Sequence, residues 1–457
     1  MFSFSPVYKQ FLTIIACNLL VLSYGWSSGW SSINLNELEN AASTYSVKGL
    51  SKDETSLVIS ILYAGSFTGT CIVIAISQMI GIKRTIHLFG LPLVASSLLL
   101  LYAQNVYYLY ASRFLCGMVS GSLVVGIPTL VNDISSDNVR GALNSLYDLF
   151  SNSGTIISFF LGKHLSMDIQ VKTQLIVPII FLLIMCLLPE SPEYWIRKCK
   201  EKRAIKSCKF YKGKVDKLER IGFTSNHPCV EAATKTIDEE DDEQLTLQDF
   251  LSPKAKKAIC VAFLSLLLSF LSCATVTFNY VERIFERTVS SNTKDYSLGI
   301  SIVQLVANVI FLTIVERFKR RTLYIWSSIL TTVSYCVFGT YCLVLLKQPK
   351  YELISVLCFV FITFISCMGM VPVPYILAVE IFPKKIRKVC LTAAILMMWI
   401  VLFALDRVFP NFLDFFELHH CFYILGVMSS LNAIFGIFCV PETKGKTHEE
   451  IMALLDN

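Results

Sequence analysis

Residues 258–281 contain no charged side chain, and this run constrains the fold more than any other feature of the sequence. A helix needs about 20 mainly apolar residues to cross the hydrocarbon core of a membrane, and this run is long enough. The whole chain carries only 16% charged residues, whereas soluble domains carry about 25%. The sequence therefore predicts an all-α polytopic membrane protein.

Eleven further apolar stretches of similar length accompany this run. They lie near residues 10–30, 55–78, 85–103, 106–131, 143–162, 172–189, 296–315, 322–346, 353–379, 389–410 and 418–440. The division is least clear within 85–131, which we split at Ala103-Gln104-Asn105. We therefore predict twelve transmembrane helices, six before the polar segment 190–257 and six after it.

Basic residues cluster in every second connection between the predicted spans. These connections contain Lys83-Arg84, Arg140, the segment 190–257, Lys319-Arg320-Arg321, Lys384-Lys385 and Arg387-Lys388. Because cytoplasmic loops carry an excess of Lys and Arg, both termini should be cytoplasmic. The predicted parts are a first six-helix bundle (1–189), a cytoplasmic loop with intracellular helices (190–257), a second bundle (258–440) and a cytoplasmic tail (441–457). The net charge of +6 reflects these loops, and we expect no nucleic-acid partner.

The segment 190–257 divides by charge. Its basic run, residues 197–220, predicts helices that brace the cytoplasmic side. Its acidic block, residues 238–243, predicts a flexible and solvated stretch.

The two halves of the sequence repeat three landmarks in the same order. A short basic turn follows the second span of each half, at 81–84 and at 316–321. An acid and an arginine seven residues apart follow the fourth span, as Asp133 with Arg140 and as Glu380 with Arg387. Each half ends on Pro-Glu, at 189–190 and 441–442. This order indicates an internal duplication and two pseudo-symmetric bundles.

The repeated charges lie where helices leave the membrane. Each acid–arginine pair can be an interfacial salt bridge that sets topology, or a latch that is made in only one conformational state. The candidate latch residues are Arg113, Asp133, Arg140, Glu190, Glu316, Arg320, Arg321, Glu380, Arg387 and Glu442. Arg113 lies inside a span, where a cation is costly, and we expect acids of the cytoplasmic network as its partners. Gly117 and Gly121 predict close helix packing.

These motifs together resemble the sugar porter family of the major facilitator superfamily over nearly the whole chain. The resemblance rests on Arg113-Phe114-Leu115-Cys116-Gly117, Pro128, Asp133, Arg140-Gly141, Pro189-Glu190-Ser191-Pro192, Glu316, Arg320-Arg321, Pro372-Val373-Pro374-Tyr375, Glu380-Ile381-Phe382-Pro383 and Pro441-Glu442-Thr443-Lys444-Gly445-Lys446-Thr447. Asn152 and Gly154 point to its insect facilitated trehalose transporter-like branch. The family implies alternating access, in which two bundles rock around a central sugar site, and a location in the plasma membrane.

The resemblance implies a sugar site with several departures from the family. The candidate substrate-binding residues are Asp148, Asn152, Thr275, Tyr280, Gln304, Tyr375 and Trp399. Phe270, Cys367 and Met398 stand where sugar porters keep hydroxyl-binding groups, and each lost partner costs a polyol on the order of 1 kcal/mol. Gln78 replaces the acid usual in the turn between spans 2 and 3. Ordinary glucose specificity therefore does not transfer.

Asp148 is an acid about two turns into the fifth span. It can pair with Arg113 or Arg140, or it can bind substrate or a proton. The first span carries no acid, which favours facilitated transport. We therefore expect a facilitative transporter of a trehalose- or hexose-like polyol. The alternatives are a proton-coupled sugar symporter that uses Asp148, and a non-transporting sugar sensor.

An enzyme is not expected, because the sequence contains no nucleophile–base or metal-ligand constellation, and we expect no cofactor. Most cysteines lie inside the apolar spans, where they act as small packing residues. His419 and His420 are adjacent and should not share a helical face, so we expect no metal there. Trp26 and Trp30 are expected to be interfacial anchors. The expected partners are a sugar and the lipid bilayer, and the expected oligomeric state is a monomer.

Overall fold

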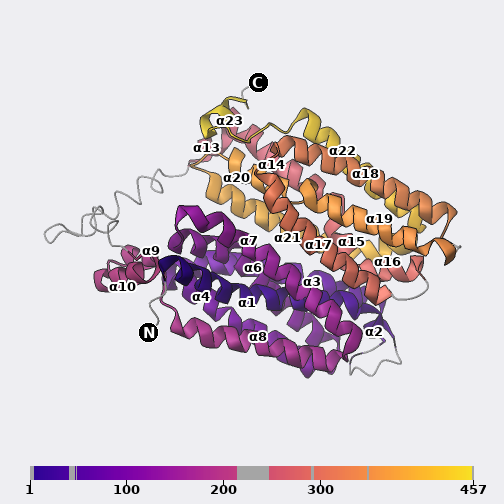
Figure 1. Ribbon diagram of the computed structural model, residues 1–457, viewed down its shortest axis with the longest axis horizontal. Coiled ribbons are helices and arrows are strands. Elements are labelled where there is room, and N and C mark those ends of the chain that lie inside the picture. Colours follow the sequence, from indigo (N-terminus) through magenta and orange to yellow (C-terminus); the bar gives the residue numbers. More distant parts are fainter. Residues whose placement is uncertain are drawn as a thin grey trace. The chain divides into compact units, whose positions relative to one another are not determined.

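The structure is a computed structural model that describes residues 5–40, 47, 49–213, 246–289, 293–346 and 349–454. The described residues are helical and form no strand (Figure 1). The first half contains α1 (Pro6–Ile33), α2 (Leu35–Glu39), α3 (Lys52–Ile80), α4 (Ile82–Leu88), α5 (Gly90–Leu101), α6 (Val106–Ile134), α7 (Asp137–His164) and α8 (Met167–Leu187). The acidic block 238–243 lies outside the described residues.

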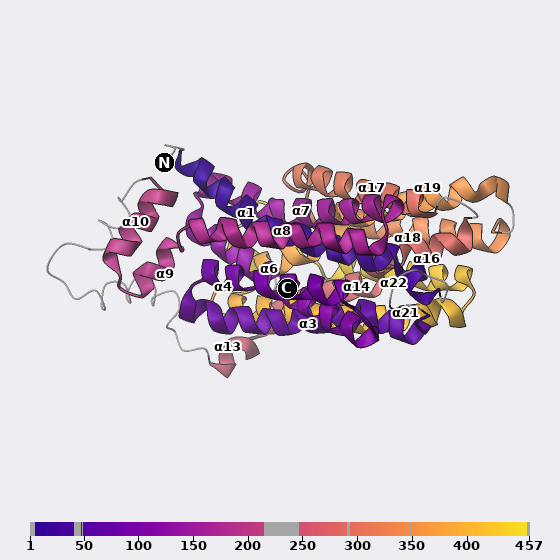
Figure 2. The ribbon, with the colours of Figure 1, turned by 90° about the horizontal axis from the view of Figure 1, so that it is seen from below.

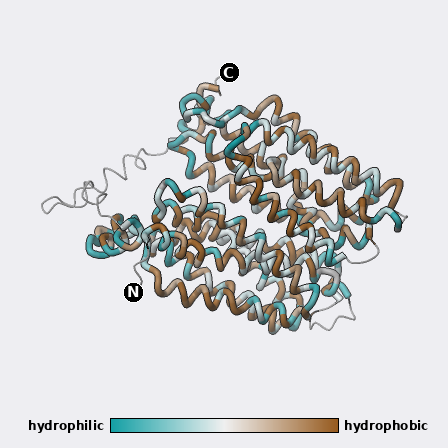
Figure 3. Tube along the Cα trace, viewed as in Figure 1, coloured by the Kyte–Doolittle hydropathy of each residue, from teal (hydrophilic) through white to brown (hydrophobic). Residues whose placement is uncertain are grey.

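The remaining helices follow the first half in chain order. They are α9 (Pro192–Arg197), α10 (Glu201–Tyr211), α13 (Leu247–Leu251), α14 (Pro253–Leu271), α15 (Ala274–Asn279), α16 (Val281–Thr288), α17 (Thr293–Val315), α18 (Arg320–Val344), η1 (Pro349–Tyr351), α19 (Glu352–Ile365), the π-helical turn η2 (Ser366–Met370), α20 (Val373–Ile381), α21 (Arg387–Phe415), α22 (Leu418–Phe438) and α23 (His448–Leu454). Colouring by hydropathy shows long hydrophobic stretches along these helices (Figure 3).

Eleven helical segments of the described chain are long and apolar enough to cross a membrane. They coincide with eleven of the twelve predicted spans. The remaining span, 143–162, is α7, which is long enough but carries several polar side chains, among them Asn144, Asp148 and Asn152. Because of these polar side chains, α7 is less apolar than the other eleven helical segments and is not counted among them.

By their internal contacts, the residues of the chain divide into two compact units. Unit 1 comprises Met1–Ser27, Ile61–Gly154 and Asp168–Gln244. Unit 2 comprises Ser28–Ser60, Thr155–Met167 and Leu245–Asn457. One end of each of α1, α3 and α7 therefore belongs to unit 2 together with the second half of the sequence.

Helices α3 and α6 of unit 1 pack backbone against backbone. A Cβ atom added to Gly117 would lie 1.8 Å from the Leu62 carbonyl oxygen, and one added to Gly121 would lie 1.8 Å from that of Ser66. The facing glycines of α3 are Gly65 and Gly69. The predicted small-residue face of Gly117 and Gly121 is therefore confirmed.

In unit 2, a kink in the tenth predicted span lets another helix approach. The π-helical turn η2 interrupts this span between α19 and α20. A Cβ atom added to Gly369 of η2 would lie 2.6 Å from the Leu323 carbonyl oxygen of α18. The kink and the glycine together permit this close contact.

Candidate functional site

Glu190 and Glu442 make the same contact in the two halves of the sequence. The Glu190 carboxylate accepts hydrogen bonds from the backbone N–H groups of Lys83, at 2.9 Å, and Arg84, at 3.0 Å. The Glu442 carboxylate accepts from those of Arg320, at 3.0 Å, and Arg321, at 3.2 Å. Free N–H groups and the positive end of the dipole lie at a helix N-terminus, here that of α4 or α18. The repeat predicted from the two Pro-Glu phrases is confirmed at this contact.

Glu190 is buried at the junction of three backbone donors. Its carboxylate also accepts from the backbone N–H of Ser191 at 3.1 Å, and the Arg84 Nε atom lies 3.8 Å away. Burial raises the pKa of the Glu190 carboxyl above its usual range, although the hydrogen bonds from Ser191, Lys83 and Arg84 oppose this shift. The Glu190 carboxylate therefore holds the start of α4 against the end of α8, and its removal from water opposes this contact.

Glu190→Gln or Glu442→Gln should lower the free energy of unfolding by about 1–3 kcal/mol, because an amide offers one acceptor oxygen to two backbone N–H groups that are buried or partly buried. Thermal unfolding of the purified protein measures this loss. Glu316→Gln is the matched control, because the Glu316 side chain is 77% exposed and its 3.7 Å contact with Arg320 is a surface ion pair. Equal losses for Glu316→Gln and Glu442→Gln would contradict the capping role.

Glu380 pairs with Arg320 and not, as expected, with Arg387. The Arg320 Nε atom lies 3.7 Å from the Glu380 carboxylate. Arg387 donates from Nε to the Phe382 carbonyl oxygen at 3.2 Å, and its Nη2 lies 3.4 Å from His448 Nδ1. As the first residue of α21, Arg387 folds back onto the turn after α20, which keeps it away from Glu380.

Asp133 likewise makes contacts other than the expected one. It lies beside Ser191, Glu193 and Arg197, at the start of α9 and in its last turn. Within the described ranges no ion pair joins Asp133 to Arg140. Sequence spacing therefore located both acids near the helix ends but did not identify their partners.

Arg113 is fully buried and binds Ser27 of α1. Its Nη1 donates to the Ser27 carbonyl oxygen at 2.5 Å and to the Ser27 hydroxyl at 3.0 Å. The expectation that Arg113 reaches acids of the cytoplasmic network is wrong, because Arg113 lies in the first half of α6 and Asp133 in its last turn. At 1.5 Å per residue the two are about 30 Å apart along the helix.

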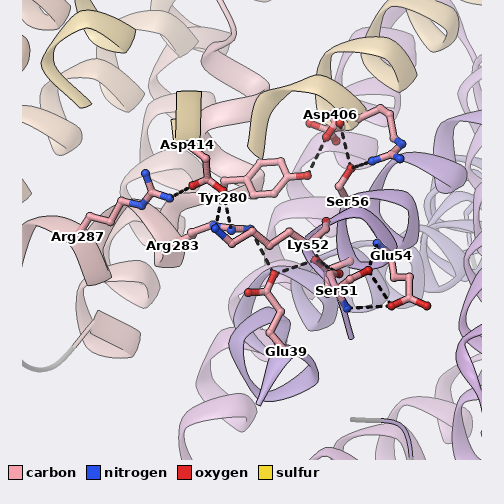
Figure 4. A network of polar contacts seen from close by, with 12 residues as sticks. Glu39, Ser51, Lys52, Glu54, Ser56, Tyr280, Arg283, Arg287, Asp406 and Asp414 are labelled. Carbon is pink, nitrogen blue, oxygen red and sulfur yellow. Dashed lines mark hydrogen bonds and ion pairs between the residues drawn. The ribbon is translucent and has the colours of Figure 1, made fainter. Parts of the chain in front are cut away.

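A second charged network, in unit 2, was not found from the sequence (Figure 4). The buried Arg283 of α16 lies 3.3 Å from the Glu39 carboxylate of α2 and 3.8 Å from the Asp414 carboxylate of α21. Asp414 also accepts from Arg287, and from Lys52 of α3 at 2.6 Å. We call Glu39, Lys52, Arg283, Arg287 and Asp414 the Arg283 network. It joins α2 and the start of α3 to α16 and the end of α21.

Two further contacts tie the start of α3 to α21. The Arg407 Nη1 atom lies 3.1 Å from the Asp53 carboxylate and donates to the Ser56 hydroxyl at 2.7 Å. The Ser56 hydroxyl in turn donates to the Arg407 carbonyl oxygen at 3.0 Å. The start of α3 is therefore held against α21 by ion pairs and hydrogen bonds together.

Asp406, a fully buried acid in α21, was also missed. Its carboxylate accepts a hydrogen bond from the Asn279 amide at 2.8 Å. Its backbone carbonyl oxygen accepts one from the Tyr280 hydroxyl at 2.8 Å (Figure 4). Tyr280 is only 1% exposed and its ring lies 5.5 Å from that of Phe409. Acids inside membrane spans are rare and are candidate functional groups.

Asp148 and Asn152 lie one helical turn apart on α7. The Asn152 amide donates to the Asp148 backbone carbonyl at 2.7 Å, and the Asp148 side chain is exposed. Among the described residues Asp148 forms no ion pair, so the pairing considered with Arg113 or Arg140 is absent. Its carboxylate remains accessible to a solute or a proton.

The other four predicted sugar-binding residues come from four helices of unit 2. They are Thr275 (α15), Gln304 (α17), Tyr375 (α20) and Trp399 (α21). Trp399 is buried, and the other three are partly buried. The Tyr375 hydroxyl donates to the sulfur of Met398, and the Tyr375 ring lies 6.1 Å from that of Phe270. Sugar binding by these residues stays a prediction.

Two smaller expectations are corrected. His419 and His420 were expected to lie on different faces of a helix, but their rings lie 3.9 Å apart and both are close to Glu417. The three residues are at the start of α22, where the spacing of the regular helix interior does not apply. Trp26 and Trp30 are buried in α1, with exposed fractions of 6% and 0%. Side chains buried among helices do not anchor the protein in the headgroup layer.

The stability of the protein should fall as the pH rises from about 4.5 to about 8. Burial raises the pKa of Glu282 in α16 to about 8, partly offset by Lys294 and reinforced by Glu286 and Glu37. A raised pKa means that the native state holds the proton more tightly, so ionisation costs roughly 4 to 5 kcal/mol above pH 8. Glu282→Gln should remove this loss in melting temperatures measured across the pH range. An unchanged pH profile in the variant would contradict the assignment.

Comparison with known proteins yields a family and a fold. The sequence profile described as "Sugar (and other) transporter" matches residues 12–455. The facilitated trehalose transporter Tret1 of Apis mellifera ligustica is 28% identical, with 97% of this chain and 87% of that protein covered. Tret1 of Bombyx mori is 25% identical, with 97% and 86% covered. The structure of the major facilitator superfamily proton:xylose symporter XylE bound to 6-bromo-6-deoxy-D-glucose matches with a TM-score of 0.72 at 18% identity, over 98% of this chain and 100% of that one. This last likeness shows the fold.

Proposed function

Because the chain belongs to the sugar (and other) transporter family, we propose that it is a facilitative carrier that moves a trehalose- or hexose-like polyol by alternating access. The chain is a multi-pass membrane protein with the fold of the major facilitator superfamily. The observation that carries the proposal is the match to facilitated trehalose transporters over 97% of the chain. The carrier acts as a monomer in the plasma membrane.

The proposed topology has twelve transmembrane helices, with α7 as the fifth and both termini in the cytoplasm. The basic connections support this orientation. The polar residues of α7, including Asp148 and Asn152, suit a helix that lines the path of a polar solute and not one surrounded by lipid. The helices α9, α10 and α13 then lie in the cytoplasm, where α9 and α10 brace the first bundle.

Alternating access requires contacts that differ between two states. We assign this role at the cytoplasmic side to the nine predicted latch residues other than Arg113, with Glu190 and Glu442 as the fixed points. On the opposite side, the Arg283 network is made in the state that the structure represents. The Arg283 network breaks when the carrier opens toward the outside. The interaction energy of the network therefore contributes to the free-energy difference between the outward-closed and outward-open states.

The positions of acidic residues in the membrane-spanning helices distinguish downhill transport from proton symport. Helix α1 contains no acidic residue, which favours downhill transport without a coupled proton. The runner-up is proton symport through Asp148, and the accessible carboxylate of Asp148 is the observation that favours it. The two modes differ in their response to an uncoupler.

Uptake of labelled trehalose, glucose, fructose and polyols into oocytes tests the function. We expect saturable uptake of at least one of these sugars, unchanged by a proton uncoupler. Asp148→Asn should change the Michaelis constant, because it alters a hydrogen-bonding group, without creating uncoupler sensitivity. Uptake that collapses with the uncoupler in the native protein, and becomes insensitive in Asp148→Asn, would establish symport instead.

A further inference from the structure

We propose that a basic cavity in unit 1 binds the phosphate group of an anionic membrane lipid. The cavity, of about 510 Å³, lies between the start of α4, the end of α8 and the helices α9 and α10. Its charged and aromatic lining consists of Lys83, Arg84, Glu190, Trp195, Arg203 and Lys206. Figures 1 and 2 both place α9 and α10 beside one another next to α4.

The walls of the cavity are fixed. The Ser207 hydroxyl donates to the Glu190 carbonyl oxygen at 2.5 Å, and the Tyr211 hydroxyl donates to that of Pro189 at 2.8 Å. The Gln10 amide donates to the Tyr211 carbonyl oxygen at 2.8 Å. Helix α10 is thus bonded both to the segment after α8 and to α1, and the cavity exists before any ligand arrives.

The cavity has an excess of positive charge. Four basic side chains line it, of which Lys83 is buried and donates to the Met185 carbonyl oxygen, so that Arg84, Arg203 and Lys206 face a ligand. The one acid, Glu190, already accepts hydrogen bonds from the backbone of Lys83 and Arg84. The Glu190 side chain is 2% exposed, whereas that of Arg84 is 47% exposed. An incoming ligand therefore meets mainly cations. Like charges held close together repel, and an anion between them relieves that repulsion.

Trp195 arranges two of these cations. The guanidinium carbon of Arg84 lies 5.1 Å from the centre of the Trp195 ring, and that of Arg203 lies 4.9 Å from it. Cation–π attraction of this kind orients guanidinium groups. Guanidinium groups bind phosphate oxygens through pairs of parallel N–H donors. Trp195 therefore orients both guanidinium groups at the cavity, where each can donate to a phosphate oxygen.

The residues around the cavity identify the ligand as a lipid. Cys186 and Leu188 contribute to the lining. Met79, Leu183 and Leu187, at the ends of α3 and α8, are 68%, 67% and 82% exposed. Such large exposed apolar side chains at the end of a membrane span fit acyl chains, while basic clusters beside spans attract anionic headgroups. A molecule with both parts is an anionic phospholipid.

Binding of phosphatidic acid to the purified full chain in detergent micelles tests the proposal, with the rise in melting temperature as the readout. Phosphatidylcholine supplies the acyl chains without net charge, and glycerol 3-phosphate supplies the phosphate without acyl chains. The variant Arg203→Gln/Lys206→Gln removes two exposed cations from the cavity. The matched control, Lys202→Gln/Lys209→Gln, removes two exposed cations of the same helix that do not line it.

We expect phosphatidic acid to stabilise the native chain and the control alike, and to bind the cavity variant roughly 10- to 30-fold more weakly. Phosphatidylcholine should stabilise neither. Equal binding by the cavity variant and the control would overturn the site, and equal effects of phosphatidylcholine would overturn its preference for anions. Tight binding of glycerol 3-phosphate alone would overturn the assignment to a lipid. Equal melting temperatures of both variants without lipid show that the substitutions leave the fold intact.

Discussion

Replacing Gly121 by leucine should leave little folded protein. A Cβ atom at this position would lie 1.8 Å from the carbonyl oxygen of Ser66, and the atoms it meets belong to backbone. Overpacking commonly costs 1–3 kcal/mol where side chains can move aside, and here the helices themselves must separate. We therefore expect a loss of at least about 3 kcal/mol, seen as a low yield of monodisperse protein and a lowered melting temperature.

Gly299→Leu is the matched control for Gly121→Leu. Gly299 also lies inside a helix, α17, but nothing stands within 4 Å of an added Cβ atom. Glycine costs a helix interior up to about 1 kcal/mol, so leucine should stabilise α17 slightly or leave it unchanged. If both variants lost stability equally, the cost would reflect leucine itself and the close contact between α3 and α6 would not be needed.

Replacing Arg283 by alanine should open the contact between α2 and α16. Arg283 is 7% exposed, whereas Glu39 and Asp414 are 24% and 26% exposed, so solvent weakens the loss that a fully buried pair would suffer. We expect a loss of about 1–3 kcal/mol, which shifts the balance between states roughly 5- to 150-fold. Hydrogen exchange of α2 and α16 should accelerate by that factor, and sugar uptake should fall.

Two further variants show whether this effect belongs to the Arg283 network. Asp414→Asn combined with Arg283→Ala should cost less than the two single changes added together, because both remove the same interaction. Lys172→Ala removes an exposed cation of α8 and should change neither exchange nor uptake. Additive losses, or equal effects of Lys172→Ala, would show that the network does not hold the two segments together.

Features that depend on local sequence could be predicted. The apolar spans follow from length and composition, and eleven of the twelve appear as suitable helices. Gly117 and Gly121 are spaced one helical turn apart, which was enough to predict a face for close packing. The two Pro-Glu phrases predicted a repeat, and Glu190 and Glu442 make matching contacts.

Features that depend on partner choice could not be predicted. Sequence spacing suggested a pair between Glu380 and Arg387, but Arg320 competes for the same acid from another helix. Arg283 and Glu39 lie far apart in the chain, and their pairing depends on how α2 and α16 pack. The mixed charges of α16 are visible in the sequence. Their partners are acids near the ends of α2 and α21, and the sequence does not show that these helix ends meet α16.

Trehalose counterflow in proteoliposomes that contain the purified protein tests the central claim most directly. Vesicles loaded with unlabelled trehalose, with no ion gradient imposed, should take up labelled trehalose to a transient excess. This excess should saturate with concentration and persist with a proton uncoupler, because exchange through alternating access needs no coupled ion. Absence of counterflow for trehalose, glucose, fructose and polyols alike would contradict the assignment of this chain as a facilitative sugar carrier.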